Sequence, residues 1–133
     1  MRFSLVVLFT FLFGACQPAP DGMSVIPADE FEQFITQADV QLLDVRTPEE
    51  FEAGHIPGAV LIDYRTDSVG FVGKAEALLK KDRPVALYCR GGRRSHSAAE
   101  LMHKAGFQQL IELEGGTMAW QKAGKELKTD KAN

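Results

Sequence analysis

Short apolar runs alternate with amphipathic stretches along most of the chain. Four runs have the length of strands, and most of them lack a clean alternation of apolar and polar residues, which is typical of strands covered on both faces. These runs are Val40–Val45, Ala59–Ile62, Val85–Tyr88 and Leu110–Leu113. Between them, apolar residues recur with the spacing of one helix face over 31–38, 71–79 and 98–105.

Local signals mark where some of these helices begin. Pro48–Glu50 predicts a first helical turn, because proline tolerates the first position and acidic residues favour the positive end of the helix dipole. For the helix over 98–105, Ser97 and Glu100 have the spacing of a capping box, and Ser95 is the alternative cap. Strands that alternate with helices predict an α/β fold, with a central parallel sheet flanked by helices on both faces.

The N-terminal residues differ in character from the rest. Met1–Arg2 supplies a positive start, and Phe3–Phe13 is an almost unbroken apolar run, too short to span a bilayer as a helix. The small residues Gly14–Ala15 follow, and then Cys16. This order is typical of a secretory signal peptide. The segment LFGAC also resembles a bacterial lipobox, in which the cysteine becomes a lipidated first residue.

These features divide the chain into four predicted parts. Residues 1–15 are a lipoprotein-type signal peptide, and residues 16–23 are a linker that starts with the lipidated Cys16. Residues 24–127 form one domain, and residues 128–133 are a frayed tail. The mature protein is then exported and held at the membrane only through its lipid, facing the periplasm or the cell surface. A soluble periplasmic protein is the alternative.

Composition agrees with one small domain, for which a monomer is expected. The chain has 133 residues, of which 45% are hydrophobic and 25% charged, and this suffices for a core without disulfides. A formal net charge of −3 does not indicate nucleic acid binding. If Cys16 carries lipid, Cys89 has no partner. Because unpaired thiols outside the cytoplasm are usually oxidised, its presence indicates that the thiol is used.

The stretch LYCRGGRRS carries the candidate chemistry at Cys89–Ser95, which we call the cysteine loop. Its two glycines allow several N–H groups to turn towards one point. Nearby cations and a helix N-terminus lower the pKa of a thiol, and the thiolate is the nucleophile. A buried structural cysteine beside an anion-binding turn is the alternative, but that would not need thiol and arginines together. We therefore predict Cys89 as the nucleophile. The predicted substrate-binding residues are Arg90, Gly91, Gly92, Arg93, Arg94 and Ser95.

Three stretches of the chain resemble the rhodanese family of sulfurtransferases. They are LLDVRTPEEFEAGHIPGAVLI at 42–62, VALYCRGGRRSHSAAELMHKAGF at 85–107 and LEGGTMAWQKAG at 113–124. The resemblance implies a rhodanese-like domain in which Cys89 is the catalytic cysteine and the rest of the cysteine loop cradles the transferred sulfur. Thiosulfate or a similar small anionic donor then gives a Cys89 persulfide. Cyanide or a thiol removes the sulfur, and no metal or organic cofactor takes part.

Other polar residues in these stretches are predicted to support the scaffold. Asp44 and Arg46 match the family's DVR motif, and we expect Asp44 to fix backbone or arginine geometry near the cysteine loop. A surface ion pair is the alternative. His55, in GHIPGA, is predicted to be structural, and His96 and His103 are predicted to be solvated.

Two other functions remain as alternatives. One is a persulfide carrier or sulfur-sensing module without efficient turnover, which could pass sulfur to an accepting protein. The other is a cysteine-dependent phosphatase, whose loop needs arginine six positions after the cysteine. Ser95 stands there in this chain, and the last arginine of the loop is Arg94. The loop of this chain is shorter, and a shorter loop suits one sulfur atom better than a tetrahedral phosphate.

Overall fold

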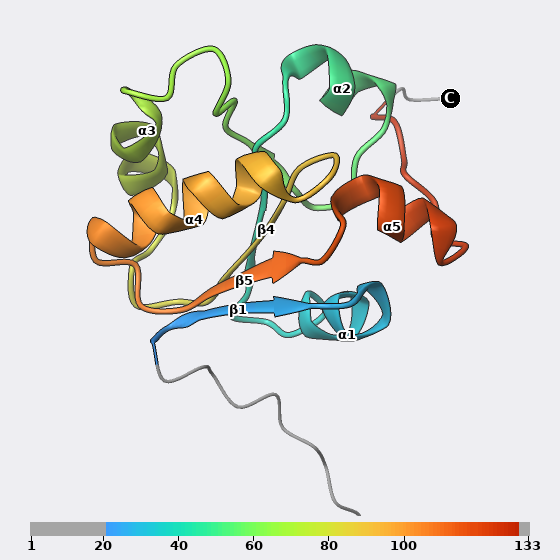
Figure 1. Cartoon of the computed structure of the whole chain (residues 1–133), viewed down its shortest axis with the longest axis horizontal. Helices are drawn as coiled ribbons and strands as arrows, with labels where there is room; N and C mark the ends of the chain where they lie inside the picture. The colour runs from blue at the N-terminus through green and yellow to red at the C-terminus, as the bar shows by residue number, and fades with distance from the viewer. Residues whose placement is uncertain (1–20, 131–133) are drawn as a thin grey trace, which may run out of the picture.

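Strands and helices alternate along residues 21–130, which are the residues that this computed structural model describes (Figure 1). The strands are β1 (Met23–Ile26), β2 (Gln41–Asp44), β3 (Val60–Leu61), β4 (Val85–Tyr88) and β5 (Leu110–Leu113). The helices are α1 (Ala28–Phe34), α2 (Pro48–Ala53), α3 (Phe71–Leu78), α4 (Arg93–Lys104) and α5 (Gly116–Lys122). All four predicted strands are present.

The strands form one parallel sheet in the order β1-β5-β4-β2-β3. β4 lies at the centre, between β5 and β2. The carboxyl ends of the strands meet at one edge, where ligands bind in sheets of this kind. Cys89 directly follows β4, so the sheet places it in the middle of that edge. The predicted α/β fold with a central parallel sheet is confirmed.

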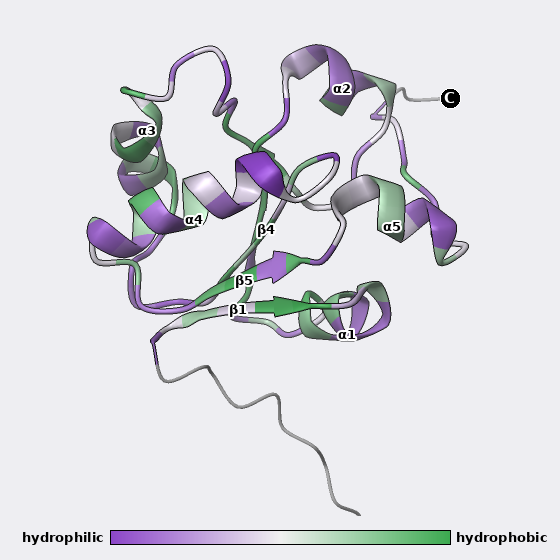
Figure 2. Cartoon of the chain, in the orientation of Figure 1, coloured by the Kyte–Doolittle hydropathy of each residue, from purple (hydrophilic) through white to green (hydrophobic). Residues whose placement is uncertain are grey.

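Helices cover both faces of the sheet, as predicted. α3 and α4 pack on one face, and α1 and α5 pack on the other (Figure 1). Neighbouring strand residues point to opposite faces: Leu87 packs in the α3–α4 layer and Ala86 in the α1–α5 layer. Every residue of β4 is buried, which explains why this strand reads as a continuous apolar run (Figure 2).

The domain begins earlier than the sequence indicated. β1 includes Met23, which was placed in the linker and which pairs with Leu110 of β5. Hydrophobic patterning missed this strand because it is short, lies at the edge of the sheet and leaves Val25 55% exposed.

The domain also ends later than the sequence indicated. Lys128, which was placed in the frayed tail, donates its N–H to the carbonyl of His55 at 2.9 Å and accepts the His55 N–H at 2.8 Å. The predicted signal peptide, Cys16 and residues 131–133 lie outside the described residues. Along 21–130, no helix is long and apolar enough to cross a membrane.

Candidate active site

The cysteine loop turns directly into α4. Gly92 has a φ of 103°, a left-handed conformation that favours glycine, and Arg93 is already helical. Both predicted caps are therefore wrong, because α4 begins before either serine could cap it. The Ser97 hydroxyl donates to the carbonyl of Arg93 at 3.3 Å, and the Ser95 Oγ lies 3.1 Å from the carbonyl oxygen of Gly92, an acceptor that competes with the Cys89 sulfur for the hydroxyl proton. The apolar pattern missed this first turn because its residues are polar or charged.

The Cys89 sulfur is buried among hydrogen-bond donors. The N–H of Gly92 donates to Sγ at 3.0 Å, and the Ser95 Oγ lies 3.5 Å from it. Burial raises the pKa of the Cys89 thiol, but the Ser95 hydroxyl and the N–H groups of Ser95, Gly92 and Gly91 outweigh burial and lower that pKa below its ordinary value. The loop therefore favours a thiolate, although Cys89 is only 1% exposed.

Among residues 21–130, Arg94 is the one arginine of the cysteine loop that forms an ion pair. Its Nη1 and Nη2 atoms lie 2.9 Å from the two carboxylate oxygens of Glu50, in α2. Thr47 caps α2 by accepting the Glu50 N–H at 3.3 Å. The Glu50 hydrogen bond is the main cause that raises the pKa of Arg94, and the nearby Cys89 thiolate contributes. The two contacts with Glu50 thus fix the Arg94 side chain.

The other two loop arginines face solvent. Arg90 and Arg93 are exposed, and neither forms an ion pair with a described residue. The sequence analysis grouped all three as substrate-binding residues. The structure brings only Arg94 into a packed position, and it leaves Arg90 and Arg93 exposed at the rim of the site.

The start of α5 holds the backbone of the cysteine loop from the other side. Thr117 donates its N–H to the carbonyl of Cys89 at 2.9 Å, and Met118 donates its N–H to the carbonyl of Arg90 at 3.1 Å. A Cβ atom at Gly116 would lie 2.3 Å from the Cys89 carbonyl oxygen. This contact between distant segments was not predicted. Through it, two carbonyl groups of the cysteine loop accept hydrogen bonds from residues outside the loop.

Asp44 and Arg46 form a buried ion pair, so the surface alternative is wrong. Arg46 Nη2 lies 2.7 Å from Asp44 Oδ2 and also donates to the carbonyl of Gly54 at 2.7 Å. The Arg46 guanidinium lies over the Tyr88 ring, 5.6 Å from its centroid. The Tyr88 hydroxyl accepts the N–H of Ile56 at 3.0 Å. These contacts fix the segment after α2, so Asp44 orients Arg46 and not an arginine of the cysteine loop.

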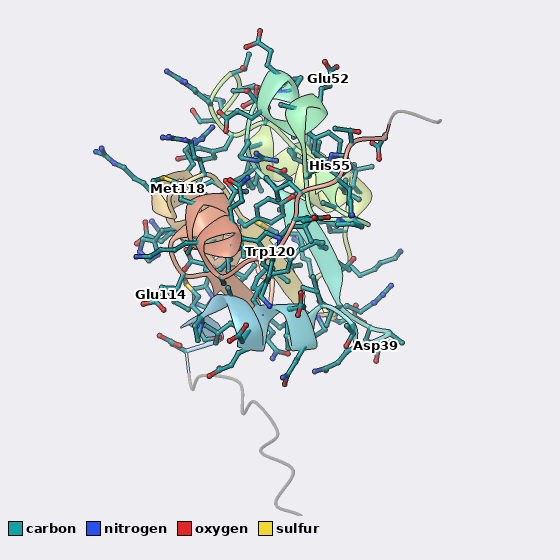
Figure 3. The ribbon with its side chains drawn as sticks, turned by 90° about the vertical axis from the view of Figure 1, so that its right-hand side faces the viewer. Asp39, Glu52, His55, Glu114, Met118 and Trp120 are labelled. Atoms are coloured by element: carbon teal, nitrogen blue, oxygen red, sulfur yellow. The ribbon has the colours of Figure 1, made fainter. Side chains whose placement is uncertain are left out.

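His55 is structural, as predicted. Its Nδ1 lies 2.8 Å from the carbonyl oxygen of Phe51, and its Nε2 lies 3.0 Å from Asp130 Oδ1. Its ring stacks on that of Phe51, with centroids 3.7 Å apart. In Figure 3, His55 lies below α2 and above Trp120, within the scaffold.

His96 is not simply solvated, as the sequence suggested. Its side chain is 56% exposed, but Nδ1 lies 3.1 Å from Oε2 of Glu112, a carboxylate in β5 that is only 4% exposed. His103 is exposed, as expected. The spacing of residues along the sequence could not predict this pair, because Glu112 lies on a strand and His96 lies on a helix.

A cleft beside the cysteine loop was also missed. It is lined by Tyr64, Arg65 and Ser68 from the connection between β3 and α3, together with Arg94. The sequence signal for this connection was only a break in apolar periodicity with several polar residues.

The fold defines the chain as an α/β protein with a cysteine at the carboxyl end of its central parallel strand. Residues 27–123 match the family described as Rhodanese-like domain. The chain therefore belongs to the rhodanese-like domain family, as its sequence motifs indicated.

Several relatives are named as sulfurtransferases. The chain is 36% identical over 104 residues to "Probable adenylyltransferase/sulfurtransferase MoeZ" of Mycobacterium tuberculosis, covering 78% of this chain and 26% of that protein. It is 31% identical over 98 residues to "Thiosulfate sulfurtransferase GlpE" of Shewanella oneidensis, covering 74% of this chain and 92% of that protein. The chain thus spans about a quarter of the Mycobacterium protein and nearly all of the Shewanella protein.

A solved structure agrees with the fold. The rhodanese-like domain protein from Staphylococcus aureus is 32% identical, with a TM-score of 0.67, and the match covers 82% of this chain and all of that chain. Family membership and fold are thus shown by sequence and by structure.

Proposed function

We propose that the protein is a sulfurtransferase that moves sulfane sulfur from thiosulfate, or a similar anionic donor, to cyanide or a thiol. The observation that carries this proposal is the position of Cys89 Sγ, which lies 3.0 Å from the N–H of Gly92 and 3.5 Å from the Ser95 hydroxyl. The lowered pKa of Cys89 supports a thiolate nucleophile. Membership of a family that includes named sulfurtransferases supports the same reaction.

The reaction proceeds in two covalent steps. The Cys89 thiolate attacks the outer sulfur of thiosulfate, the sulfur–sulfur bond of the donor breaks, and its electron pair leaves on sulfite. The remaining persulfide anion, Cys89–S–S⁻, has its charge stabilised by the fixed N–H donors of the loop. Cyanide then attacks the outer sulfur, thiocyanate leaves, and the electron pair of the broken bond returns to Sγ as thiolate. Atoms and electrons balance without a further oxidant or reductant.

Intact-mass spectrometry of the full chain after thiosulfate treatment tests this proposal. We expect the mass of one added sulfur atom, removed again by cyanide. The Cys89→Ser variant should gain no sulfur, whereas the matched Cys16→Ala variant should gain it normally, since these are the two cysteines of the chain. An unchanged mass with both thiosulfate and polysulfide would contradict the proposal.

A persulfide carrier that passes sulfur to an accepting protein is a second candidate. The 1% exposure of Cys89 favours it, because a buried sulfur reacts slowly with a free acceptor until a partner opens the site. An adduct that forms with polysulfide, but turns over slowly with cyanide, would favour the carrier. Hydrolysis of an aryl phosphate that depends on Cys89 would instead favour the phosphatase alternative.

We propose further that residues 1–15 direct export and that a lipid on Cys16 anchors the mature protein. The order of basic, apolar and small residues in this segment supports the proposal. The Cys16→Ala variant is expected to move from the membrane fraction to the soluble fraction, while Cys89→Ala stays at the membrane. Unchanged membrane partitioning of Cys16→Ala would count against lipidation.

A further inference from the structure

The cleft next to the cysteine loop is large for a small inorganic anion. Its volume is about 460 Å³, and its lining residues are Tyr64, Arg65, Ser68 and Arg94. Sites for organic ligands commonly measure roughly 300–1,000 Å³, whereas a water molecule occupies only about 30 Å³. Thiosulfate alone would leave most of this space to solvent. The volume therefore suits an organic molecule.

The cleft adjoins the cysteine loop. Arg94 lines it and is adjacent in sequence to Ser95, whose hydroxyl lies 3.5 Å from Cys89 Sγ. Figure 1 shows the connection between β3 and α3 on the same side of the molecule as α2, the helix whose Glu50 holds Arg94. A ligand in the cleft thus contacts Arg94 of the cysteine loop.

The wall of the cleft is built into the fold. The Tyr64 N–H donates to the carbonyl of Val45, at the end of β2, at 3.2 Å. The Tyr64 ring packs edge-on against Phe71, with centroids 5.4 Å apart and planes at 81°. Tyr64 therefore presents a fixed aromatic surface to the cleft.

Arg65 supplies a guanidinium that is not paired with a described carboxylate. The carboxylate of Asp63 accepts the N–H groups of Arg65 and Thr66 at 2.8 and 3.2 Å, and Asp67 accepts the N–H of Gly70 at 2.7 Å. These acids are thus occupied by the backbone of the connection itself. The Arg65 guanidinium has no ion-pair partner among the residues placed in the structure.

The Arg94 guanidinium is less available to a ligand than that of Arg65. Both of its terminal nitrogens already bind the carboxylate of Glu50. A planar guanidinium matches a carboxylate with two parallel hydrogen bonds, so Arg65 is the group in this cleft that is available for such a partner.

We propose that this cleft binds the carboxylate of a small organic thiol that takes sulfur from Cys89, with Arg65 as its carboxylate-binding residue. The inference rests on the proposed sulfur transfer. In the transfer, the bound thiolate attacks the outer sulfur of the persulfide anion, Cys89–S–S⁻, and forms a new sulfur–sulfur bond. The bond to Sγ breaks, its electron pair stays on Sγ as thiolate, and the organic persulfide leaves as its anion.

A matched pair of acceptors tests the selectivity of this transfer. N-acetylcysteine and N-acetylcysteamine differ only in the carboxylate. With the full chain loaded by thiosulfate, we expect faster sulfur transfer to N-acetylcysteine. The Arg65→Met variant should lose about tenfold of this preference, the range of one charge-assisted hydrogen-bonded contact.

The control for charge is Arg83→Met, the same substitution just before β4, at the opposite end of the sheet from Cys89. Arg83→Met should keep the full preference for N-acetylcysteine. Equal preference in the wild type and in Arg65→Met would overturn the proposal, as would equal losses in both variants.

A binding measurement separates this inference from the proposed function. N-acetyl-S-methylcysteine carries the carboxylate but cannot accept sulfur. NMR titration of the full chain is expected to shift the amide signals of Arg65 and Ser68, and these shifts should disappear in Arg65→Met. Binding of this compound without any sulfur transfer would retain the cleft as a carboxylate site and reject the transfer. Absence of these shifts in the wild type would reject the cleft even if Cys89 forms a persulfide.

Discussion

At the Cys89 sulfur, burial and hydrogen bonding act in opposite directions. Burial disfavours the thiolate, and the donors of Ser95, Gly92 and Gly91 favour it strongly enough to lower the pKa of Cys89. The sequence analysis credited arginine charge and a helix N-terminus with this effect. The structure assigns the main effect to the donors that touch the sulfur, so single donors can be tested.

Removing the Ser95 hydroxyl should make the thiol harder to ionise. In Ser95→Ala, Sγ loses a donor, and a hydrogen bond to a charged group contributes about 1.5–3 kcal/mol. The rate of alkylation by iodoacetamide, below the pKa of the thiol, should therefore fall about tenfold or more. The pH dependence of alkylation measures this change. Ser97→Ala is the control, since its hydroxyl bonds only the carbonyl of Arg93; equal profiles for both variants would contradict the assignment.

At the scale of elements, the site is a contact between three segments. The loop between β4 and α4 brings the sulfur, α2 brings Glu50 to Arg94, and the start of α5 binds the carbonyls of Cys89 and Arg90. With those carbonyls occupied by α5, the loop N–H groups are available to the sulfur. Packing between elements therefore sets the direction of the loop donors.

An added methyl group at Gly116 should disrupt this packing. Gly116 has a φ of 60°, and its Cβ would lie 2.3 Å from the Cys89 carbonyl oxygen. We expect Gly116→Ala to lower the free energy of unfolding by about 3 kcal/mol, from overpacking and left-handed strain together. Sulfur loading of Cys89 should be lost as well. Urea unfolding and intact mass measure the two effects.

Gly124→Ala is the matched control for that substitution. Gly124 has a φ of 81°, and no heavy atom lies within 4 Å of its Cβ position. Only left-handed strain applies there, so the loss should be about 1 kcal/mol with normal sulfur loading. Equal stability losses in both variants would show that the contact with the cysteine loop is not tight.

At the scale of the whole molecule, the His96–Glu112 pair links stability to pH. The hydrogen bond that His96 donates to Glu112 raises the pKa of His96, and burial raises the pKa of Glu112. The folded state therefore binds protons more tightly than the unfolded state at both groups. At His96, this stabilisation is complete below the ordinary pKa of about 6.5 and is lost as the pH rises through the higher folded value; at Glu112, the loss begins at the lower ordinary pKa of a glutamate.

Glu112→Gln should flatten this pH dependence. We expect the unfolding free energy of the wild type, relative to that of Glu112→Gln, to fall between pH 6 and 8. The change should be less than about 1 kcal/mol, because solvent screens the exposed imidazole. Urea unfolding followed by the fluorescence of Trp120, the only tryptophan of the chain, measures it. The exposed Glu114→Gln is the control and should run parallel to the wild type; a parallel curve for Glu112→Gln would contradict the linkage.

Local patterns predicted the elements that have a strong periodic signal. β4 and β5 have the predicted bounds, because β4 is an uninterrupted buried run and β5 is apolar except for Glu112. β1 was missed, since an edge strand buries only part of its residues. The start of α4 was misplaced, because its first turn carries the polar residues of the site and leaves no apolar stripe.

The sequence by itself determined the fold class, the family and the position of the thiol, because periodicity and a strand–cysteine–glycine–helix order are properties of neighbouring residues. Only the tertiary structure decided which groups surround the sulfur. Glu50 and Arg94 are 44 residues apart in the chain, and Thr117 lies on α5 whereas the Cys89 carbonyl that it binds lies in the loop after β4. Such contacts depend on the order of strands in the sheet and on which helices cover each face. Strand order and helix placement depend on residues far apart in the chain, so the pattern of neighbouring residues does not determine them.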